Sequence, residues 1–346
     1  MKRISFLIAL FTAITISASA EQLYVNGKKG NDANLGTQSE PLKTLQEAAR
    51  RVNMNAKKEA TTIILSGGVH LLTETVLFNN NKYTAENRLT IRAETMPDDA
   101  GWTPQQMPAL ALVAPTIPDG DGEEARGIDI EVNHATIEGL RFTGGPEFYY
   151  IDGKHNRRAY PIWRDGNNLD DLLVTQCMFT GDPDILPVRV AVIAKGHGLV
   201  VDHCVFYRCQ NPVVFWDAEG GSSRRNSMRY CLVYNCFYSG MWTTKNTAED
   251  FEFHHNIVTG CGTAWVKEGD ARYKVSNCIF SENKNQAAIQ SDVSTQKTPA
   301  PFNFLQMSDV KMTGSIEIER DQSKNNWLQL KTGSFGTELK TGLFKK

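Results

Sequence analysis

Seven cysteines at regular spacing constrain the fold of this chain more than any other feature. All of them lie within one third of the sequence, at Cys177, Cys204, Cys209, Cys231, Cys236, Cys261 and Cys278. A step of 27 residues occurs twice in a series that starts at Cys177 and once in a second series that starts at Cys209. Self-similarity at a fixed period of about 20 to 50 residues is the signature of a repeat architecture. The cysteines therefore predict a repeat protein before any other motif is considered.

The residues around the cysteines repeat a short strand, a tight turn and another short strand. Residues 174–179 read Val-Thr-Gln-Cys-Met-Phe, and residues 201–206 read Val-Asp-His-Cys-Val-Phe. Alternation of this kind, rich in Val and Phe, is typical of strands. A unit of 22 to 27 residues with about three short strands cannot bury its own apolar face, so successive units must stack into a solenoid.

The cysteines themselves are best interpreted as core residues. Cysteine is among the most frequently buried residue types, and it behaves as a small hydrophobe in a tight inward-facing turn. Disulfides between neighbouring repeats are the alternative, because stacked strands lie within the Cα separation that a disulfide needs. The spacing contains no short Cys-x-x-Cys pair, which argues against a zinc site.

Residues 1–20 have the pattern of a secretory signal. Lys2 and Arg3 precede an apolar stretch at Phe6–Ile16, and Ala18-Ser19-Ala20 form a small-residue cleavage site. We therefore expect a protein that is secreted or periplasmic. No other apolar run approaches the roughly 18 residues that span a membrane, so we expect no membrane span.

The charge balance argues against nucleic acid as a partner. The formal net charge is -2 and becomes more negative when Lys2 and Arg3 are removed, whereas nucleic-acid binders carry basic surfaces. Local basic clusters still allow an anionic polysaccharide or oligosaccharide as partner. We expect the protein to be a monomer.

The region after the signal carries three motifs in succession. Residues 24–37 run from a strand into a Gly/Asn/Asp loop, residues 41–48 open a short amphipathic helix with a Thr-x-x-Glu capping box, and residues 63–68 form a strand and turn. In this order the motifs resemble the first coil of exported right-handed parallel β-helix proteins of the pectate-lyase-like superfamily. The resemblance extends through the repeats to about residue 290. It implies an all-β chain, a single right-handed parallel β-helix with a short N-terminal capping helix.

The domain organisation follows from this resemblance. We expect a signal peptide at 1–20, the β-helix at 21–296, and a C-terminal coil and cap at 297–346. Residues 144–161 interrupt the repeat as an insertion, and insertions in a solenoid often emerge at the binding face. Residues 327–334 resemble the closing strand and cap of such proteins.

The resemblance also implies a substrate groove on the strands that follow the second cysteine series. Alternation along these strands predicts that Val213, Met241 and Ala264 point inward. The tryptophans are expected to point outward, as an aromatic row that stacks on sugar rings. The predicted substrate-binding residues are Trp163, Arg164, Trp216, Trp242, Trp265, Lys195 and Lys267.

Two reactions fit the charged residues beside this row. For β-elimination on a uronate, which we place first, Lys245 is the candidate base, and Arg189 with Arg164 would bind the carboxylate. Some of the resembling lyases use Ca²⁺ for this neutralisation, and the acidic run at 119–124 is a candidate Ca²⁺ site although it lacks the full EF-hand spacing.

Hydrolysis by two carboxylates is the second reaction, with Asp165, Asp217 and Glu268 as candidates. A glycan-binding protein without catalysis is the third interpretation, and it needs only the tryptophans. The sequence thus predicts an exported polysaccharide-active enzyme, with a lyase placed ahead of a glycoside hydrolase and of a binding protein.

Overall fold

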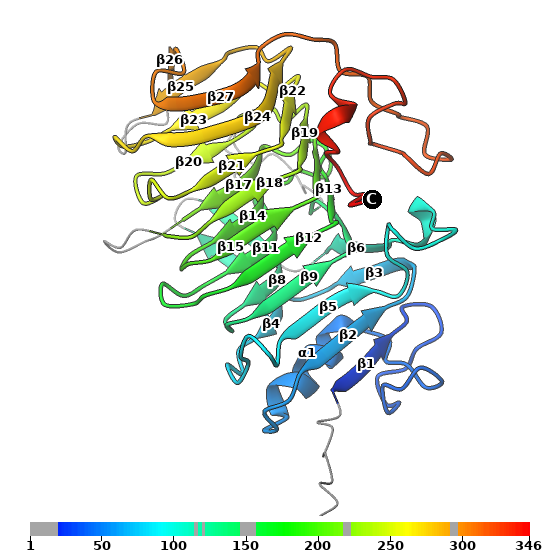
Figure 1. The fold of residues 1–346 in the computed structure, drawn as a ribbon. Coiled ribbons are helices and arrows are strands. Elements are labelled where there is room, and N and C mark those ends of the chain that lie inside the picture. Colours follow the sequence, from blue (N-terminus) through cyan, green and yellow to red (C-terminus); the bar gives the residue numbers. More distant parts are fainter. Residues whose placement is uncertain (1–19, 114–116, 120–121, 146–156, 217–222, 291–296) are drawn as a thin grey trace, which may run out of the picture.

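The computed structural model describes residues 20–113, 117–119, 122–145, 157–216, 223–290 and 297–346. The chain coils upward from the N-terminal end in a series of stacked turns, as Figure 1 shows. The predicted signal peptide, apart from Ala20, lies outside the described residues, as do Asp217, most of the 144–161 insertion and part of the 119–124 acidic run. No helix of the described residues is long and apolar enough to cross a membrane.

The coils between β2 (Thr61–Leu65) and β23 (Trp265–Lys267) each contribute one strand to each of three stacks of parallel strands. Stack 1 consists of β1 (Glu21–Val25), β2 (Thr61–Leu65), β5 (Leu89–Ala93), β9 (Ala135–Glu138), β12 (Leu172–Thr175), β15 (Leu199–Asp202), β18 (Ser227–Arg229), β21 (Glu252–His254), β24 (Tyr273–Ser281) and β27 (Leu305–Lys311). Stack 2 consists of β3 (Gly68–Leu72), β6 (Pro108–Leu112), β10 (Arg141–Thr143), β13 (Met178–Thr180), β16 (Val205–Tyr207), β19 (Leu232–Tyr234), β22 (Ile257–Thr259) and the second half of β24.

Stack 3 forms a separate sheet. It consists of β4 (Val76–Phe78), β8 (Gly122–Ile130), β11 (Arg157–Arg164), β14 (Val190–Ala194), β17 (Asn211–Phe215), β20 (Trp242–Thr243), β23 (Trp265–Lys267), β25 (Ala287–Gln290) and β26 (Lys297–Ala300). Neighbouring strands are parallel except that β26 and the short β7 (Ile117–Asp119) pair antiparallel with β25 and β8. The predicted parallel β-helix is confirmed.

The cysteines occupy the inner side of the turns, as predicted. The residue before each first-series cysteine has a positive φ, for example 52° at Gln176 and 48° at His203, and this conformation turns the chain between stacks 1 and 2. All seven cysteines are buried and free, so the disulfide alternative is not realised. The Sγ atom of Cys204 lies 3.6 Å from the carbonyl oxygen of Val174 in the coil below, and the ladder therefore stays inside the core.

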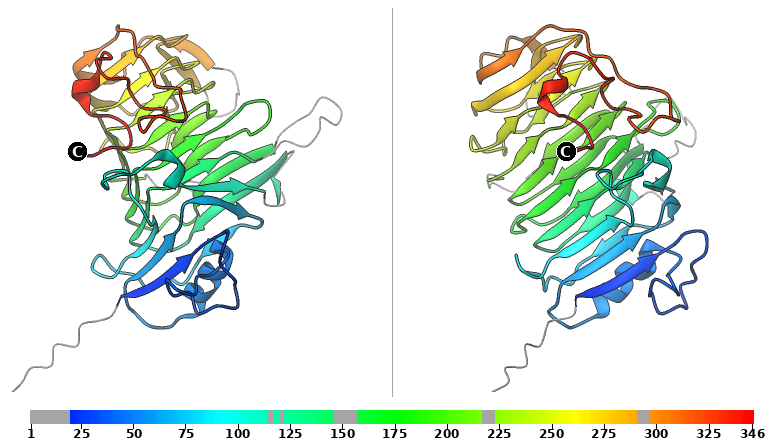
Figure 2. Two further views of the ribbon diagram at one scale, coloured as in Figure 1. Left: turned by 90° about the vertical axis from the view of Figure 1, so that its right-hand side faces the viewer. Right: turned by 45° about the vertical axis from the view of Figure 1, so that its right-hand side comes forward.

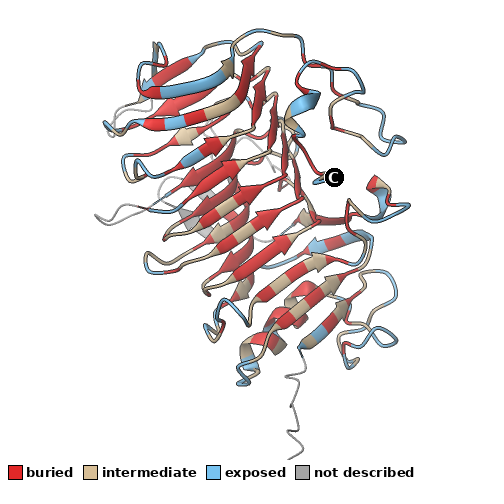
Figure 3. Ribbon diagram, in the orientation of Figure 1, coloured by how far each residue is buried: buried red, intermediate tan, exposed pale blue. Residues whose placement is uncertain are grey.

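Identical positions of successive coils stack on one another throughout the core. The rings of Phe142, Phe179 and Phe206 form a column with centroid separations of 5.1 and 5.0 Å and nearly parallel planes. Figure 3 shows buried residues along the strands of the middle coils and exposure mainly in the turns. Because equivalent residues stack from coil to coil, each additional repeat buries apolar area against its neighbour and stabilises the solenoid.

Helix α1 (Leu45–Met54) covers the N-terminal end of the core. The Thr44 hydroxyl accepts a hydrogen bond from the amide of Glu47 at 3.1 Å, which is one half of the predicted capping box. The other half is absent, because the Thr44 amide donates to Asp32 Oδ1 at 2.9 Å and Glu47 instead pairs with Arg50 and Arg51. The preceding loop thus caps this helix.

The resemblance of residues 327–334 to a closing strand and cap had suggested that the C-terminal segment covers the open end of the coil. The segment lies elsewhere. It runs back along the outer face of stack 2, where Ile316, Ile318 and Leu328 pack on outward residues of the strands. Its 3₁₀ helix η2 (Thr337–Leu339) lies in the same segment, whereas η1 (Pro104–Gln106) belongs to an earlier excursion. Figure 2 shows this segment beside the strands from two further directions. The C-terminal segment therefore covers the outer face of stack 2 and leaves that of stack 3 uncovered.

Candidate functional site on the outer face of stack 3

Aromatic side chains line the upper part of the outer face of stack 3. Trp216 is 39% exposed, and its ring meets that of Trp242 edge to face at a centroid distance of 6.3 Å. The Tyr238 ring also contacts Trp242, at a centroid distance of 6.0 Å. The outward orientation predicted for Trp216 and Trp242 is confirmed, and together with Tyr238 they form what we call the aromatic strip.

Trp265 is a core residue, and the outward orientation predicted for it is wrong. It is fully buried, and its ring packs against Phe253 and Tyr273 at centroid distances of 5.0 and 5.9 Å. The prediction aligned Trp265 with Trp242, but strand pairing aligns Trp242 with Val266. A shift of one residue moves a side chain to the opposite face of a strand, so Trp265 cannot contact a polysaccharide.

Arg164 also points into the coil, contrary to its predicted role in substrate binding. It pairs with Ile130 and Ala194 in the neighbouring strands and is 1% exposed. Its Nε donates to the carbonyl oxygen of Lys195 at 2.6 Å, while Nη1 and Nη2 are buried without a partner. Burial lowers the pKa of Arg164 to about 10, and nearby Asp170 and Asp171 oppose that shift.

The three lysines of the predicted site, Lys195, Lys245 and Lys267, fall at different positions along the paired strands. Lys195 lies on the outer face and pairs with Asp165 at 2.6 Å. Lys267 is 8% exposed, pairs in register with Thr243, and places its amine 5.1 Å from the Phe304 ring centroid. Burial lowers the pKa of Lys267. Of the lysines predicted to bind substrate, only Lys195 is placed to do so.

Lys245 and Arg189, the predicted base and carboxylate clamp, stand at opposite ends of the strands. Trp242 pairs with Val214, and Val214 pairs with Ile193. Lys245 follows Trp242 by three residues, and Arg189 precedes Ile193 by four. At about 3.3 Å per residue these steps separate the two backbones by about 20 Å. One sugar residue cannot place its acidic carbon at Lys245 and its carboxylate at Arg189.

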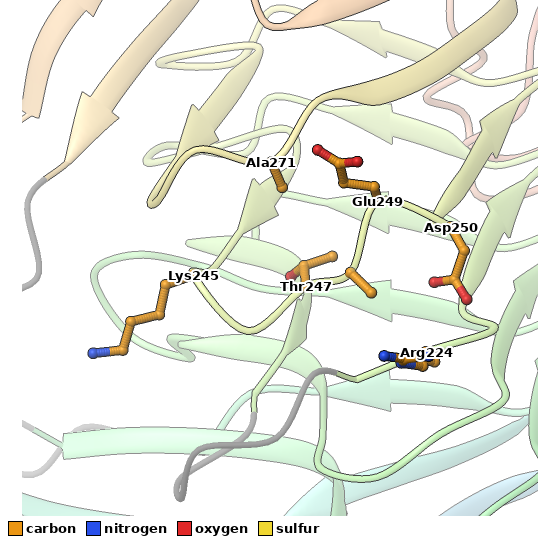
Figure 4. A pocket seen from close by; sticks show the side chains of 7 residues that line it. Arg224, Lys245, Thr247, Glu249, Asp250 and Ala271 are labelled. Atoms are coloured by element: carbon orange, nitrogen blue, oxygen red, sulfur yellow. The ribbon is translucent and has the colours of Figure 1, made fainter.

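Lys245 instead borders a pocket of about 370 Å³ at the turn between β20 and β21. Figure 4 shows its side chain extending away from Glu249, Asp250 and Arg224, which line the other side. Glu268, one of the carboxylates predicted for hydrolysis, is 8% exposed and accepts a hydrogen bond from Trp242 Nε1 at 3.0 Å. Glu268 therefore positions the aromatic strip.

A charged cluster lies lower on the same face. It contains Trp163, Asp165 and Lys195, which the sequence predicted for this face, together with Glu124, Arg126 and Asp129, which it did not. Arg126 Nη1 is 3.0 Å from Asp129 Oδ2 and 3.6 Å from Asp165 Oδ2, and the same guanidinium contacts Glu124 at 2.7 Å. The Arg126 guanidinium also lies over the ring of Trp163, 4.1 Å from its centroid. We call these residues, with Lys195, the carboxylate cluster.

The two aspartates of the carboxylate cluster have pKa values shifted in opposite directions. Burial raises the pKa of Asp129 to about 6, against the opposing effect of Arg126, and the charges of Glu131 and Asp165 raise it further. Burial also acts to raise the pKa of Asp165, but the hydrogen bond and charge of Lys195 outweigh it and hold that pKa below its ordinary value. Near pH 5, Asp129 is thus a proton donor and Asp165 a carboxylate.

A signal for Asp129 was present in the sequence. It stands between Ile128 and Ile130, which are both fully buried, so alternation alone turns it outward. Strand pairing places it beside Trp163, in the same column as Trp242. Extending the alignment of outward positions to the strands that precede the cysteine repeats would have identified Asp129.

No group of three or more His, Cys, Asp or Glu side chains able to hold a metal ion occurs among the residues that the structure describes. The acidic run at 119–124 lies partly outside those residues, so the Ca²⁺ site stays a prediction.

A family model described as right handed beta helix region matches residues 123–296, about half of the chain. This chain belongs to the right-handed β-helix family. The handedness and the parallel coils agree with the sequence prediction, and the resemblance to the pectate-lyase-like superfamily is confirmed at the level of the fold. No curated protein matches the chain in sequence.

Solved structures with a similar coil include three enzymes. They are a lacto-N-biosidase from Eubacterium ramulus (12% identity over 78% of this chain and 53% of that one, TM-score 0.44), pectate lyase Pel9A (9%, 92% and 91%, 0.47) and a rhamnogalacturonan lyase (11%, 94% and 100%, 0.41). This right-handed β-helix spans about half the length of the lacto-N-biosidase. At such identities the likeness concerns the fold alone, and the reaction has to be argued from the residues of this chain.

Proposed function

We propose that this right-handed β-helix is an exported enzyme that hydrolyses glycosidic bonds of a polysaccharide on the outer face of stack 3. The observation that carries the proposal is the pair Asp129 and Asp165, whose pKa values are shifted in opposite directions beside one arginine. Two titratable groups with diverging pKa values are the usual basis of acid and base roles at one site. The signal-like residues 1–20 support export.

In the proposed reaction Asp129 donates its proton to the glycosidic oxygen, and the leaving sugar departs as an alcohol. Asp165 remains ionised and either activates a water molecule that attacks the anomeric carbon, or attacks that carbon itself to form a glycosyl ester that water then hydrolyses. Lys195 keeps Asp165 ionised. Arg126, fixed over Trp163, positions both carboxylates and is not itself a proton donor.

The aromatic strip supports the polysaccharide on one side of the cleaved bond, above the carboxylate cluster. The amide of Trp216 donates to the carbonyl of Ala194 at 2.8 Å, and Ala194 directly precedes Lys195, so the exposed ring lies close to the carboxylate cluster along the solenoid axis. The exposed aromatic face offers a large apolar surface on which a sugar ring can stack. The residues that bind the polysaccharide and the residues that cleave it thus lie on the same face of the solenoid.

Elimination by a lyase has less support. It requires a base and a carboxylate clamp at one sugar residue, and Lys245 and Arg189 are too far apart along the strands to provide them. The Ca²⁺ that the family resemblance implies would serve elimination and not hydrolysis. Glycan binding without catalysis is the other candidate, and the exposure of Trp216 beside Trp242 supports it.

A substrate panel tests the proposal. Neutral and acidic polysaccharides are incubated with the protein, and the products are assayed both for reducing ends and for the ultraviolet absorbance of unsaturated uronates. We expect reducing ends without absorbance, and we expect their loss in Asp165→Asn but not in Lys245→Ala. Absorbance that disappears in Lys245→Ala would instead establish a lyase, and retained binding without any product would establish a glycan-binding protein.

A further inference from the structure

One coil of the solenoid carries no side chains on the outside of its turn between stack 2 and stack 3. The second cysteine series occupies the inner side of this turn, and the residues on either side of each cysteine face outward. They are Arg208 and Gln210 around Cys209, Asn235 and Phe237 around Cys236, Gly260 and Gly262 around Cys261, and Glu282 and Lys284 around Asn283. Only the third of these turns has glycine on both sides.

Hydrogen bonds between successive turns show that these positions stack. The amide of Gly262 donates to the Cys236 carbonyl at 2.9 Å, and the amide of Lys284 donates to the Cys261 carbonyl at 2.9 Å. Phe237 is therefore one coil below Gly262, and Lys284 is one coil above it. Two coil steps of about 4.8 Å leave about 10 Å between their backbones.

The missing side chains leave a slot in the surface. A pocket of about 390 Å³ is lined by Phe237, Gly260, Gly262 and Asn235, with Arg208 and Lys284 at its ends. Its volume is within the range of small-ligand sites, about 300 to 1,000 Å³. Phe237 is 42% exposed. This exposure is unusual for a large aromatic residue, because phenylalanines of the neighbouring coils, such as Phe206, Phe215 and Phe253, are buried in the core.

The chemistry of the lining fits an acidic sugar. An exposed aromatic face stacks on a pyranose ring, and the Asn235 amide offers both a donor and an acceptor to hydroxyl groups. The charged residues of the lining are cations, Lys284 and Arg208, although Arg208 also contacts Asp182 at 3.3 Å. A carboxylate on the sugar would complement that charge.

We propose that this slot is an accessory binding site for a uronate residue of a polysaccharide, separate from the outer face of stack 3. Its ligand class rests on the proposed function, whereas the slot itself rests on the Gly260-Cys261-Gly262 turn. Because the slot lies at the turn before stack 3, it would hold an acidic chain near the protein without entering the carboxylate cluster.

The chain offers a variant that fills the slot with little strain. Gly260 has a φ of +64°, a left-handed conformation in which Asn is the best-tolerated residue with a side chain. Asn235 already adopts φ 54° at the equivalent position one coil below. A Cβ atom at position 260 would meet Asn235 Oδ1 at 2.2 Å, and that side-chain end can rotate away. Gly260→Asn should therefore fold and block the slot.

The experiment is calorimetric titration of the full chain with a trimer of galacturonic acid and with the neutral trimer of galactose. Phe237→Ala, Lys284→Gln and Gly260→Asn are compared with the wild type. Phe335→Ala and Lys57→Gln serve as matched controls, because Phe335 and Lys57 are exposed elsewhere on the surface.

We expect the acidic trimer to bind and each slot variant to weaken that binding by about tenfold, with both controls unchanged. The same titration in Trp242→Ala separates the two sites, since slot binding should persist there. Binding that disappears in Trp242→Ala and survives in Gly260→Asn would overturn the slot and leave the proposed function intact. Equal binding of the neutral trimer, or no binding of either trimer to the wild type, would also overturn it.

Discussion

Asp129→Asn should stabilise this protein at neutral pH, and the magnitude follows from the structure. The Asp129 carboxyl is 4% exposed and has a pKa of about 6, against an ordinary value of 3.8. Each pKa unit corresponds to about 1.36 kcal/mol, so ionised Asp129 costs the folded state up to about 3 kcal/mol relative to its protonated form. Asparagine has the shape of the protonated acid and carries no charge.

The sign of the effect depends on pH. Below about pH 4, Asp129 is protonated in both the folded and the unfolded state, and the variant should match the wild type in stability. As pH rises through about 6, the wild type loses stability because the unfolded chain releases the proton more readily. The advantage of Asp129→Asn should therefore grow between pH 4 and pH 6 and stay constant above that range.

Urea denaturation of both proteins from pH 4 to pH 8 measures this difference. Asp165→Asn is the matched control: the depressed pKa of Asp165 contributes stability that is lost only below its ordinary value of 3.8, so this variant should be less stable than the wild type by a constant amount from pH 4 to pH 8. An Asp129→Asn difference that does not vary with pH, or a loss of stability that grows toward neutral pH, would refute the reasoning about this carboxyl.

The remaining predictions concern burial. Trp265→Ala should lower the free energy of unfolding by about 3 to 5 kcal/mol. Trp242→Ala should change it by no more than about 1 kcal/mol but should weaken binding of the polysaccharide substrate. Denaturation and affinity electrophoresis measure the two effects, and equal losses of stability would contradict the strand register. Arg164→Met should hold or raise the melting temperature, because it replaces a buried cation with two unpartnered nitrogens by an apolar chain, and a large drop would mean that the guanidinium is compensated. Cys204, whose burial raises the pKa of its thiol, should react with a thiol reagent only in denaturant, and rapid reaction of the native protein would contradict the buried ladder.

The sequence was sufficient for the fold because the fold is periodic. A period of about 27 residues fixes which positions stack, and the same period places the cysteines and the Phe142–Phe206 column inside the coil. The capping helix could likewise be read from Thr44 and the apolar positions after it.

The outward face was harder to predict because it depends on register within each coil. The coil that ends at Cys261 has 25 residues, whereas earlier coils have 27. An alignment error of one residue in this coil assigned the outward position of Val266 to Trp265. Asp129 was missed because its strand precedes the cysteine repeat. The contacts of Arg126 with Asp129 and with Asp165 of the neighbouring strand depend on the fold. No local sequence pattern predicts that one guanidinium contacts carboxylates from two strands.

The pH dependence of polysaccharide cleavage tests the central claim most directly. On the first substrate that yields reducing ends, kcat/KM should fall as pH rises through about 6, because Asp129 must be protonated to act as the acid. Asp129→Asn should remove both that limb and most of the activity, while Lys245→Ala should preserve the profile. A rate that rises through neutral pH and is lost in Lys245→Ala would contradict the account and return the chemistry to a lysine base.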